Sequence, residues 1–358
     1  SSKFKLGILG GGQLGKMLLY ETRKWDIQTK VMDPSPEAPC KIACNEFVLG
    51  DLLDFDKVYS FGKDVDLLTI EIENVNVEAL EKLEEEGVRV IIGLPDMKVH
   101  AKLCVIKKRE FKKTTQYAFI STGNFNENTA RYYGDHCLLT TKRPLIADVN
   151  RVFNFLENPT PDFALLNKCA VLPVSPTNMR DFFVDLIDKE IKAAKKKQPA
   201  AVTIKLNSLV DETLIGKLYD AAKAGVDVKL IIRGSCCAYT EQNAFKKPIH
   251  AISIVDEYLE HARVFVFHNG GQPKVFISSA DWMVRNLDHR VETACPILDK
   301  GIQEELIHIL NIQLKGNVKA RILDNEQRNE YVKRLKDEPV VRSQMDIYAY
   351  LHKKKYKG

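Results

Sequence analysis

Two histidines in this sequence occur in the same local pattern, each two residues before a cation on an apolar stretch. His100 precedes Lys102 in "KVHAKLCVI", and His261 precedes Arg263 in "LEHARVFVFH". Residues two apart on a strand lie on one face of a sheet, so each imidazole would emerge beside its cation. An imidazole can attack phosphorus or transfer a proton, and a cation can hold phosphate oxygens. The spacing therefore predicts chemistry on a phosphate group.

The likeness of the two stretches continues downstream of the histidines. Four small or polar residues follow each of them, "STGN" at 121–124 and "SSAD" at 278–281. A carboxylic acid comes 11 residues after the last of these four, Asp135 in the first copy and Glu292 in the second. Because a carboxylate can hydrogen-bond the far nitrogen of an imidazole and fix its tautomer, we expect both acids to orient histidines.

The duplication of this whole unit favours one composite site. A lone histidine on an apolar strand is more often a buried core residue, but a repeated set of polar neighbours favours catalysis or phosphate binding. We expect the two half-sites to face one another, so that one histidine attacks phosphorus and the other handles the proton of the entering or leaving oxygen. The side chains predicted to hold phosphate in these repeats are Lys102, Asn124, Arg263, Ser279 and Asp281.

A second candidate site lies near the beginning of the sequence. Residues 3–33 read as a strand, a glycine turn, a helix and a second strand, which is a βαβ unit. Gly10, Gly12 and Gly15 have the GxGxxG spacing directly after the strand, where backbone amides and a helix N-terminus can receive a phosphate. The same spacing also suits a tight turn that packs the helix on the strand without a ligand.

Strands and helices alternate through the rest of the chain. Residues 64–93 predict strand, helix and strand, and the proline-rich stretch 157–178 is the clearest boundary between domains. We therefore expect an α/β protein with mostly parallel sheets and flanking helices, divided into 1–88, 89–178 and 179–358.

Composition limits the classes of protein that this chain can represent. Its 358 residues are 45% apolar, and no apolar run approaches the roughly 20 residues that span a bilayer, so we expect a cytoplasmic protein. The eight cysteines lack zinc-ligand spacing, which favours reduced thiols. Residues 1–88 hold 10 Lys+Arg and 17 Asp+Glu, whereas the remainder holds 43 and 31. This basic remainder fits a polyanionic partner, although a solvated lysine surface would give the same balance.

The duplicated unit resembles that of the phospholipase D superfamily, with its HxK signature. Residues 89–358 resemble one branch of it more closely, the catalytic region of bacterial polyphosphate kinase. The stretches that carry this resemblance are "KVHAKLCVI", "STGNFNENTARYYGD", "NSLVDETLIGKLYDAAKAGV", "IIRGSCC", "ISIVDEYLEHARVFVFHNGG" and "VFISSADWMVRNLDHRVE".

This resemblance implies a phosphotransferase with a two-lobed, phospholipase D-like core. His100 would take the γ-phosphoryl group of ATP as a phosphohistidine and pass it to polyphosphate, with His261 as acid/base. Tyr133 matches the tyrosine beside the nucleotide, and Arg233 an arginine on its phosphates. The resemblance further implies Mg²⁺ as a cofactor and ATP/ADP and polyphosphate as partners. It implies no nucleic-acid partner, and a homo-oligomer is compatible with it.

Residues 1–88 resemble a different family, the carboxyaminoimidazole ribonucleotide synthetases of the ATP-grasp group. "GILGGGQLGKML", "VMDPSPEAPC" and "TIEIENVNVEALEKLEEEGV" stand as they do in the Rossmann-like first domain of that family. The resemblance implies a phosphate over Gly11, Gly12, Gln13 and Leu14, within the loop from Gly10 to Gly15 and with Glu73 nearby. The whole chain therefore looks like a chimera, natural or engineered, with a joint near Val88.

The joint bears on the expected activity. Polyphosphate kinases carry an arginine-bearing "KARFDE" stretch for metal and phosphate where this chain reads "IEIENVN". Losing a phosphate-clamping arginine commonly lowers phosphoryl transfer by about 10³ or more, so we expect binding of nucleotide or polyphosphate with weak or absent kinase turnover. Two alternatives remain open, a non-catalytic chimera and a phospholipase D-like phosphodiesterase or nuclease that uses water as the acceptor.

Overall fold

The chain consists of two compact units, Ser1–Pro95 and Asp96–Gly358, in a computed structural model that describes residues 3–72, 74–90, 94, 97–111 and 113–355. The boundary between the two units falls a few residues after the predicted boundary at Val88, because the strand Arg89–Val90 pairs within the sheet of the smaller unit. From residue 96 on, the predicted segments 89–178 and 179–358 lie together in the larger unit. Among the described residues no helix is long and apolar enough to cross a membrane. All eight cysteines are described, and none forms a disulfide.

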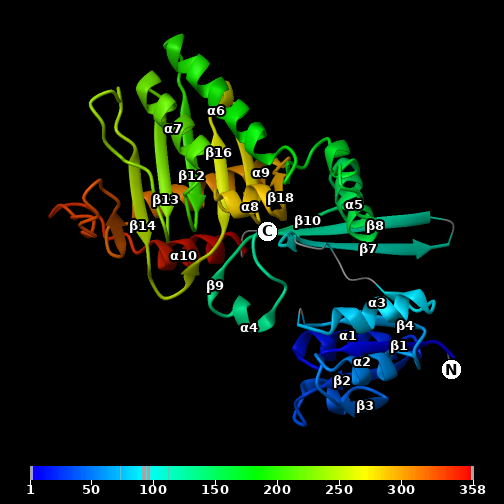
Figure 1. The fold of residues 1–358 in the computed structure, drawn as a ribbon. Coiled ribbons are helices and arrows are strands. Elements are labelled where there is room, and N and C mark those ends of the chain that lie inside the picture. The colour runs from blue at the N-terminus through cyan, green and yellow to red at the C-terminus, as the bar shows by residue number, and fades with distance from the viewer. Residues whose placement is uncertain (1–2, 73, 91–93, 95–96, 112, 356–358) are drawn as a thin grey trace. The chain divides into compact units, whose positions relative to one another are not determined.

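The smaller unit is a parallel sheet with helices, as the βαβ pattern predicts (Figure 1). Its strand order is β3-β2-β1-β4-β5. The strands are β1 (Lys5–Leu9), β2 (Gln28–Asp33), β3 (Glu46–Leu49), β4 (Leu67–Ile70) and β5 (Arg89–Val90). The helices are α1 (Gln13–Arg23), η1 (Pro39–Ile42), α2 (Phe55–Gly62) and α3 (Val77–Glu85). Side-chain caps start two of them, because Asp54 accepts from the Lys57 N–H and Asn76 from the Ala79 N–H.

The larger unit is built on a nine-stranded sheet. Its main path is β11-β18-β17-β16-β12-β13-β14-β19, and β6 pairs with β18. Its strands are β6 (Lys98–Val99), β11 (Val174–Ser175), β12 (Ala201–Leu206), β13 (Asp227–Ile232), β14 (His250–Ile254), β16 (Arg263–Phe267), β17 (Lys274–Ser278), β18 (Arg290–Pro296) and β19 (Ala320–Ile322). The helices that accompany it are η2 (Leu166–Lys168), α6 (Met179–Lys195), α7 (Glu212–Ala224), η3 (Asn269–Gly271), α8 (Val284–Asp288), α9 (Lys300–Leu314) and α10 (Ser343–Lys355).

The α/β class is confirmed, but the large sheet is mixed. Its centre is parallel, β12 with β13 and β13 with β14, and helix α7 makes the crossover between β12 and β13. The strands β16, β17 and β18 are antiparallel neighbours. Phe183 of α6 lies within the core that packs against this sheet. The centroid of its ring lies 4.8 Å from that of Phe265 and 5.8 Å from that of Trp282.

A smaller antiparallel sheet of three strands carries the first histidine motif. It has the order β10-β8-β7, with β7 (Lys102–Glu110), β8 (Lys113–Ser121) and β10 (Cys137–Thr140). Helix α5 (Arg143–Glu157) packs on β7 and β8. The short helix α4 (Glu127–Ala130) precedes β9 (Tyr133–Gly134), which pairs with β15 (Leu259–Glu260) beside the second motif.

Candidate active site

The backbone bends at both motif histidines, and this bend interrupts the strand. His100 lies between β6 and β7, where its N–H and that of the next residue both donate to the Val291 carbonyl at 2.9 Å. His261 lies between β15 and β16, where its N–H and the next one donate to the Gly134 carbonyl at 3.2 and 2.9 Å. Successive amides of an extended strand point to opposite sides, so two donors to one acceptor require a bend. The expectation that each histidine and its cation share one continuous strand is therefore wrong.

The two histidines are held by carboxylates of opposite repeats. His100 Nδ1 lies 2.8 and 2.9 Å from the two carboxylate oxygens of Glu292. His261 Nδ1 lies 2.9 Å from both carboxylate oxygens of Asp135. The carbonyls that anchor the histidine backbones belong to the residues just before these acids. Each repeat thus supplies the acid that orients the other repeat's imidazole, which makes the two half-sites one structure.

Each acid is supported by the hydroxyl of its own repeat. The Thr122 hydroxyl donates to Asp135 at 2.6 Å, and the Ser279 hydroxyl donates to Glu292 at 2.5 Å. Asn286 adds an N–H to Glu292 at 2.7 Å. Ser279 was predicted to hold phosphate, but its hydroxyl is buried and engaged with the carboxylate. Thr122 and Asn286 were not predicted, although Thr122 stands at the place of Ser279 in the repeat.

The carboxylate of Asp135 is stabilised in its ionised form. Burial acts to raise its pKa, but the hydrogen bonds from His261 and Thr122 and the charge of Arg263 outweigh burial and lower the pKa below its usual value. An ionised carboxylate can only accept hydrogen bonds, so the proton of the pair resides on His261 Nδ1. Its Nε2 lies 3.2 Å from Nη1 of Arg263.

The two motif cations are buried in different ways. Lys102 donates to the His100 carbonyl, and burial lowers the pKa of its ammonium to about 8. Glu292 raises that pKa and Arg263 lowers it, so charges of the second repeat act on Lys102 of the first. Arg263 is fixed by Asp281 through contacts of 2.9 and 3.3 Å. Each histidine thus has the cation of its own repeat in contact with it, and such cations can hold phosphate oxygens.

The structure gives Asp281 a role different from the one predicted, whereas the phosphate-binding role of Asn124 stays a prediction. Asp281 accepts from Arg263 and from the N–H groups of Asn207 and Ser208, at 2.7 and 3.2 Å for the two amides. A carboxylate engaged in this way holds the arginine and does not itself bind phosphate. Asn124, its counterpart in the first repeat, is exposed and makes no hydrogen bond with the described residues.

Asn207 is a site residue that the sequence analysis missed. Its Oδ1 accepts from Nε and Nη2 of Arg233 at 3.0 and 2.9 Å, and its Nδ2 donates to the His261 carbonyl at 3.1 Å. Asn207 follows β12, and the carboxyl ends of parallel strands are a common place for binding residues, which was the available signal. The Tyr133 ring lies 5.0 Å from that of His261, so Tyr133 and Arg233 both lie beside the second motif.

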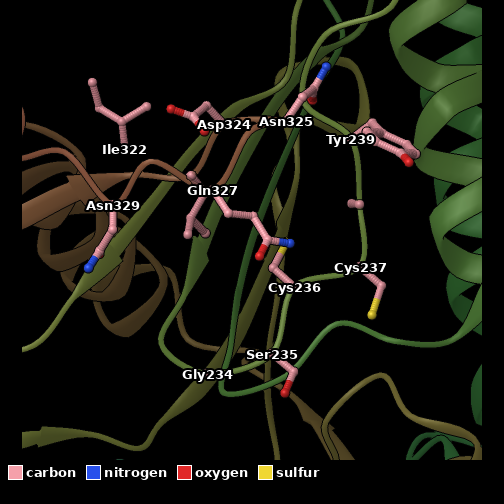
Figure 2. Close-up of a pocket in the computed structure, with 12 residues that line it drawn as sticks. Gly234, Ser235, Cys236, Cys237, Tyr239, Ile322, Asp324, Asn325, Gln327 and Asn329 are labelled. Carbon is pink, nitrogen blue, oxygen red and sulfur yellow. The ribbon is translucent and has the colours of Figure 1, made fainter.

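Figure 2 shows a cavity of about 710 Å³ whose lining begins at Gly234. It lies between the loop that follows β13 and the loop that follows β19. Its labelled lining residues are Gly234, Ser235, Cys236, Cys237, Tyr239, Ile322, Asp324, Asn325, Gln327 and Asn329. The cavity includes none of the predicted site residues.

The glycine loop of the smaller unit presents carboxylates as well as amides. Gly10 has φ of 99°, a left-handed conformation that favours glycine. The Gly11 N–H already donates to Asp33 at 2.6 Å, and a Glu71 oxygen lies 2.5 Å from where a Cβ on Gly12 would stand. A phosphate over the predicted Gln13 and Leu14, which begin α1, would meet these two negative charges. Predicted Glu73 lies outside the described residues, and Gly15 packs against Cys40.

Mg²⁺ can be tested against the donors around the histidines. Asp135 and Glu292 hold histidines, and Asp281 holds Arg263. No group of three His, Cys, Asp or Glu side chains in the described part of the chain could hold a metal ion. These carboxylates therefore do not fit a Mg²⁺ ion held by the protein alone.

The site is thus a repeated His-x-Lys/Arg unit whose halves exchange their orienting acids, set in an α/β protein. The family models that match are Polyphosphate kinase C-terminal domain 1 at residues 63–162, Polyphosphate kinase C-terminal domain 2 at 172–344 and the Ribonucleotide synthetase preATP-grasp domain at 3–99. The chain thus belongs, over its larger unit, to the polyphosphate kinase family, and its smaller unit is of the preATP-grasp type.

Relatives and solved structures agree with the family models. Polyphosphate kinase of Vibrio cholerae is 48% identical over 279 residues, which are 78% of this chain and 39% of the relative. Polyphosphate kinase of Escherichia coli K12 is 44% identical over 283 residues, 78% of this chain and 40% of the relative. The crystal structure of polyphosphate kinase from Porphyromonas gingivalis matches with a TM-score of 0.71 and 37% identity, covering 85% of this chain and 47% of that one. The chain spans about two fifths of the length of these curated relatives.

Proposed function

We propose that the larger unit is a phosphotransferase core of the polyphosphate kinase type, which moves the γ-phosphoryl group of ATP to polyphosphate through a phosphohistidine. The crossed pairing of His100 with Glu292 and of His261 with Asp135 carries the proposal. Because Glu292 binds Nδ1 of His100, the free nitrogen Nε2 is left to attack phosphorus. His261 has the same arrangement, so its Nε2 can take or give the proton of the terminal oxygen.

The cations complete the proposed roles. Lys102, when protonated, and Arg263 would neutralise the charge on the transferred phosphoryl group, which is the main task of a phosphoryl-transfer site. Arg233, held by Asn207, would bind nucleotide phosphates, and Tyr133 would lie beside the nucleotide. His100 then exchanges its phosphoryl group between ADP and the end of the polyphosphate chain.

We propose that turnover is slow. The stretch at 70–76, "IEIENVN", carries no cation where the family uses arginine, and loss of one such arginine costs about 10³ in rate. We further propose that the chain is a chimera of two families. Its support is the overlap at residues 63–99, which both a polyphosphate kinase model and the preATP-grasp model match.

Labelling with γ-³²P ATP tests this function. We expect an acid-labile, base-stable label on the chain that disappears in His100→Ala. The matched control is His352→Ala, since His352 is exposed on α10 and lies 5.8 Å from the Tyr348 ring. Equal labelling of the two variants would contradict a phosphohistidine at His100.

The same two histidines could serve a phosphodiesterase that uses water as acceptor. Cleavage of bis-nitrophenyl phosphate or plasmid DNA, lost in His100→Ala and His261→Ala, would establish that activity. A folded chain with neither label nor cleavage would be the non-catalytic chimera.

A further inference from the structure

The strand that leads into His261 is held on both of its edges. On one edge β15 pairs with β9, and the Leu259 N–H donates to the Tyr132 carbonyl at 2.7 Å. On the other edge the partner is a side chain. The Tyr258 N–H donates to Oε1 of Gln344 at 3.0 Å, and Nε2 of Gln344 donates to the Tyr258 carbonyl at 2.8 Å. Because a side-chain amide has the same kinds of donor and acceptor as a peptide group, Gln344 takes the place of a neighbouring strand.

Gln344 also binds the carboxylate that directly precedes His261. Its Nε2 donates to Oε1 of Glu260 at 2.9 Å, and Gln313 donates to Oε2 at 2.7 Å. Lys205 forms an ion pair with the same carboxylate, and all four side chains are buried. Burial acts to raise the pKa of Glu260, but the charge of Lys205 and these hydrogen bonds outweigh burial and lower the pKa below its usual value. Glu260 is therefore an ionised carboxylate held at a fixed position beside the histidine.

The position of β15 determines how His261 meets Asp135. Asp135 directly follows β9, and both of its carboxylate oxygens lie 2.9 Å from Nδ1 of His261. The His261 N–H donates to the Gly134 carbonyl of β9 at 3.2 Å. A shift of β15 along β9 would therefore move the imidazole away from the carboxylate. Since β9 and β15 are each two residues long, their pairing supplies few hydrogen bonds, and the contacts of Gln344 on the outer edge limit such a shift.

The beginning of α10, which carries Gln344, is anchored on the same segment. Arg342 pairs with Asp256 through contacts of 2.7 and 3.0 Å, and the Val341 N–H donates to Asn317 at 2.8 Å. Residues 342–344 thus run along residues 256–260, so the amide of Gln344 is presented to β15 from a fixed backbone.

We propose that Gln344 is a positioning residue for His261. By holding Tyr258 and Glu260, it keeps β15 in the register in which Asp135 accepts from Nδ1 of the imidazole. The use of His261 as acid/base rests on the proposed function, whereas its positioning by Gln344 does not.

Long-range ¹H–¹⁵N NMR of the whole chain, labelled at histidine, tests this proposal at alkaline pH, where a neutral imidazole shows which nitrogen carries the proton. Gln344→Met keeps the length of the side chain and removes its hydrogen bonds to Tyr258 and Glu260. We expect the ratio of the Nδ1–H to the Nε2–H form of His261 to fall by about fivefold or more, because a hydrogen bond to a charged group is weakened. His261→Ala identifies the signal.

Two control variants separate positioning from a loss of stability. Gln313→Met removes another donor to Glu260 but leaves Tyr258 held, and Ala349→Gly destabilises α10 at an exposed position. Both should lower the free energy of unfolding and leave the tautomer ratio unchanged. Gln344→Asn keeps the amide on a shorter side chain. It replaces Q344M if circular dichroism shows that variant to be unfolded, and it should shift the ratio in the same direction.

Kinetics provides a separate readout for the proposed function. If His261 is the acid/base, Q344M should lower kcat for phosphoryl transfer about tenfold or more and change the KM for ATP little, because a misplaced catalytic group lowers the rate. An unchanged tautomer ratio in folded Q344M or Q344N, or an equal fall in A349G, would overturn the positioning role. A shifted ratio in a chain whose unaltered form transfers no phosphoryl group would support the positioning role and contradict the proposed function alone.

Discussion

The Nδ1 atom of His100 lies 2.8 Å from Oε1 of Glu292, a residue 192 positions later in the sequence. The carboxylate fixes the imidazole so that Nε2 carries the lone pair. Glu292 in turn receives hydrogen bonds from Ser279 and Asn286, which leaves it little freedom to rotate. The proposed nucleophile in the first half of the unit therefore depends on an acid from the second.

Replacing Glu292 by glutamine should remove this control of the tautomer. We expect E292Q to lower the rate of ³²P labelling by about 10²–10⁴, as loss of an imidazole-orienting carboxylate does in hydrolytic triads. Glu305→Gln is the matched control, since Glu305 pairs with Lys354 on the surface of α9. If E292Q labels at the rate of the unaltered chain, the carboxylate does not govern the nucleophile.

Asp135 approaches residue 123 so closely that only glycine fits at this position. A Cβ on Gly123 would lie 2.0 Å from the Asp135 Oδ2 atom, so G123A must displace the carboxylate that holds His261. We expect G123A to destabilise the chain by about 1–3 kcal/mol in denaturant unfolding and to reduce phosphoryl transfer. Gly216→Ala provides the control, because Gly216 lies inside α7 with open space around its Cβ position. Alanine there should stabilise the helix by up to about 1 kcal/mol.

Lys102 should make anion binding depend on pH. Burial lowers the pKa of its ammonium to about 8, so the charge is present below pH 8 and is lost as the pH rises through that value. We expect the affinity for ATP or polyphosphate to fall between about pH 8 and 10, with the midpoint moved upward when the anion is bound. Lys102→Arg keeps its charge throughout this range and should flatten the profile. A wild-type profile as flat as that of K102R would contradict the role of Lys102.

The same group affects stability. Since the pKa of Lys102 is lower in the folded chain than in the unfolded chain, the unfolded chain binds more protons between about pH 8 and 10.5. The contribution of Lys102 to the free energy of unfolding therefore rises with pH across that window. Below it, Lys102 costs on the order of 3 kcal/mol. Lys102→Met should raise the free energy of unfolding at pH 7 and remove this part of the pH dependence, as urea titrations would show.

Much of the candidate site could be predicted because the sequence repeats itself. The spacing identified both histidines, both cations and both acids without reference to their positions in space. It could not show which acid holds which histidine, because that pairing is made across the fold, between β6 and β18 and between β15 and β9. Each repeat contains both a histidine and an acid, so the sequence alone suggests that they pair with each other. Only the pairing of strands in the structure shows that each acid holds the histidine of the other repeat.

Bends in the backbone and the hydrogen-bond partners of individual side chains explain the remaining differences from the sequence prediction. His100 and His261 lie at bends, because two successive amides donate to one carbonyl, and alternation of apolar residues does not reveal such a bend. Asp281 resembles a phosphate ligand in the repeat, yet Arg263 and the amides after β12 occupy it. Asn207 belongs to no repeated motif, so its contacts with Arg233 and His261 were visible only in three dimensions.

Asn207 should act as a positioning residue for Arg233. Asn207→Ala removes the Oδ1 atom that accepts from Nε and Nη2 of Arg233, and it leaves the His261 carbonyl without its N–H donor. We expect the KM for ATP to rise about tenfold, because the arginine is no longer held toward nucleotide phosphates, with a smaller loss in kcat. A double-mutant cycle with Arg233→Ala separates this role from a general loss of structure. If Asn207 acts through Arg233, N207A should change the KM little once the arginine is gone; a full tenfold effect in the R233A background would show that Asn207 acts on the site by another route.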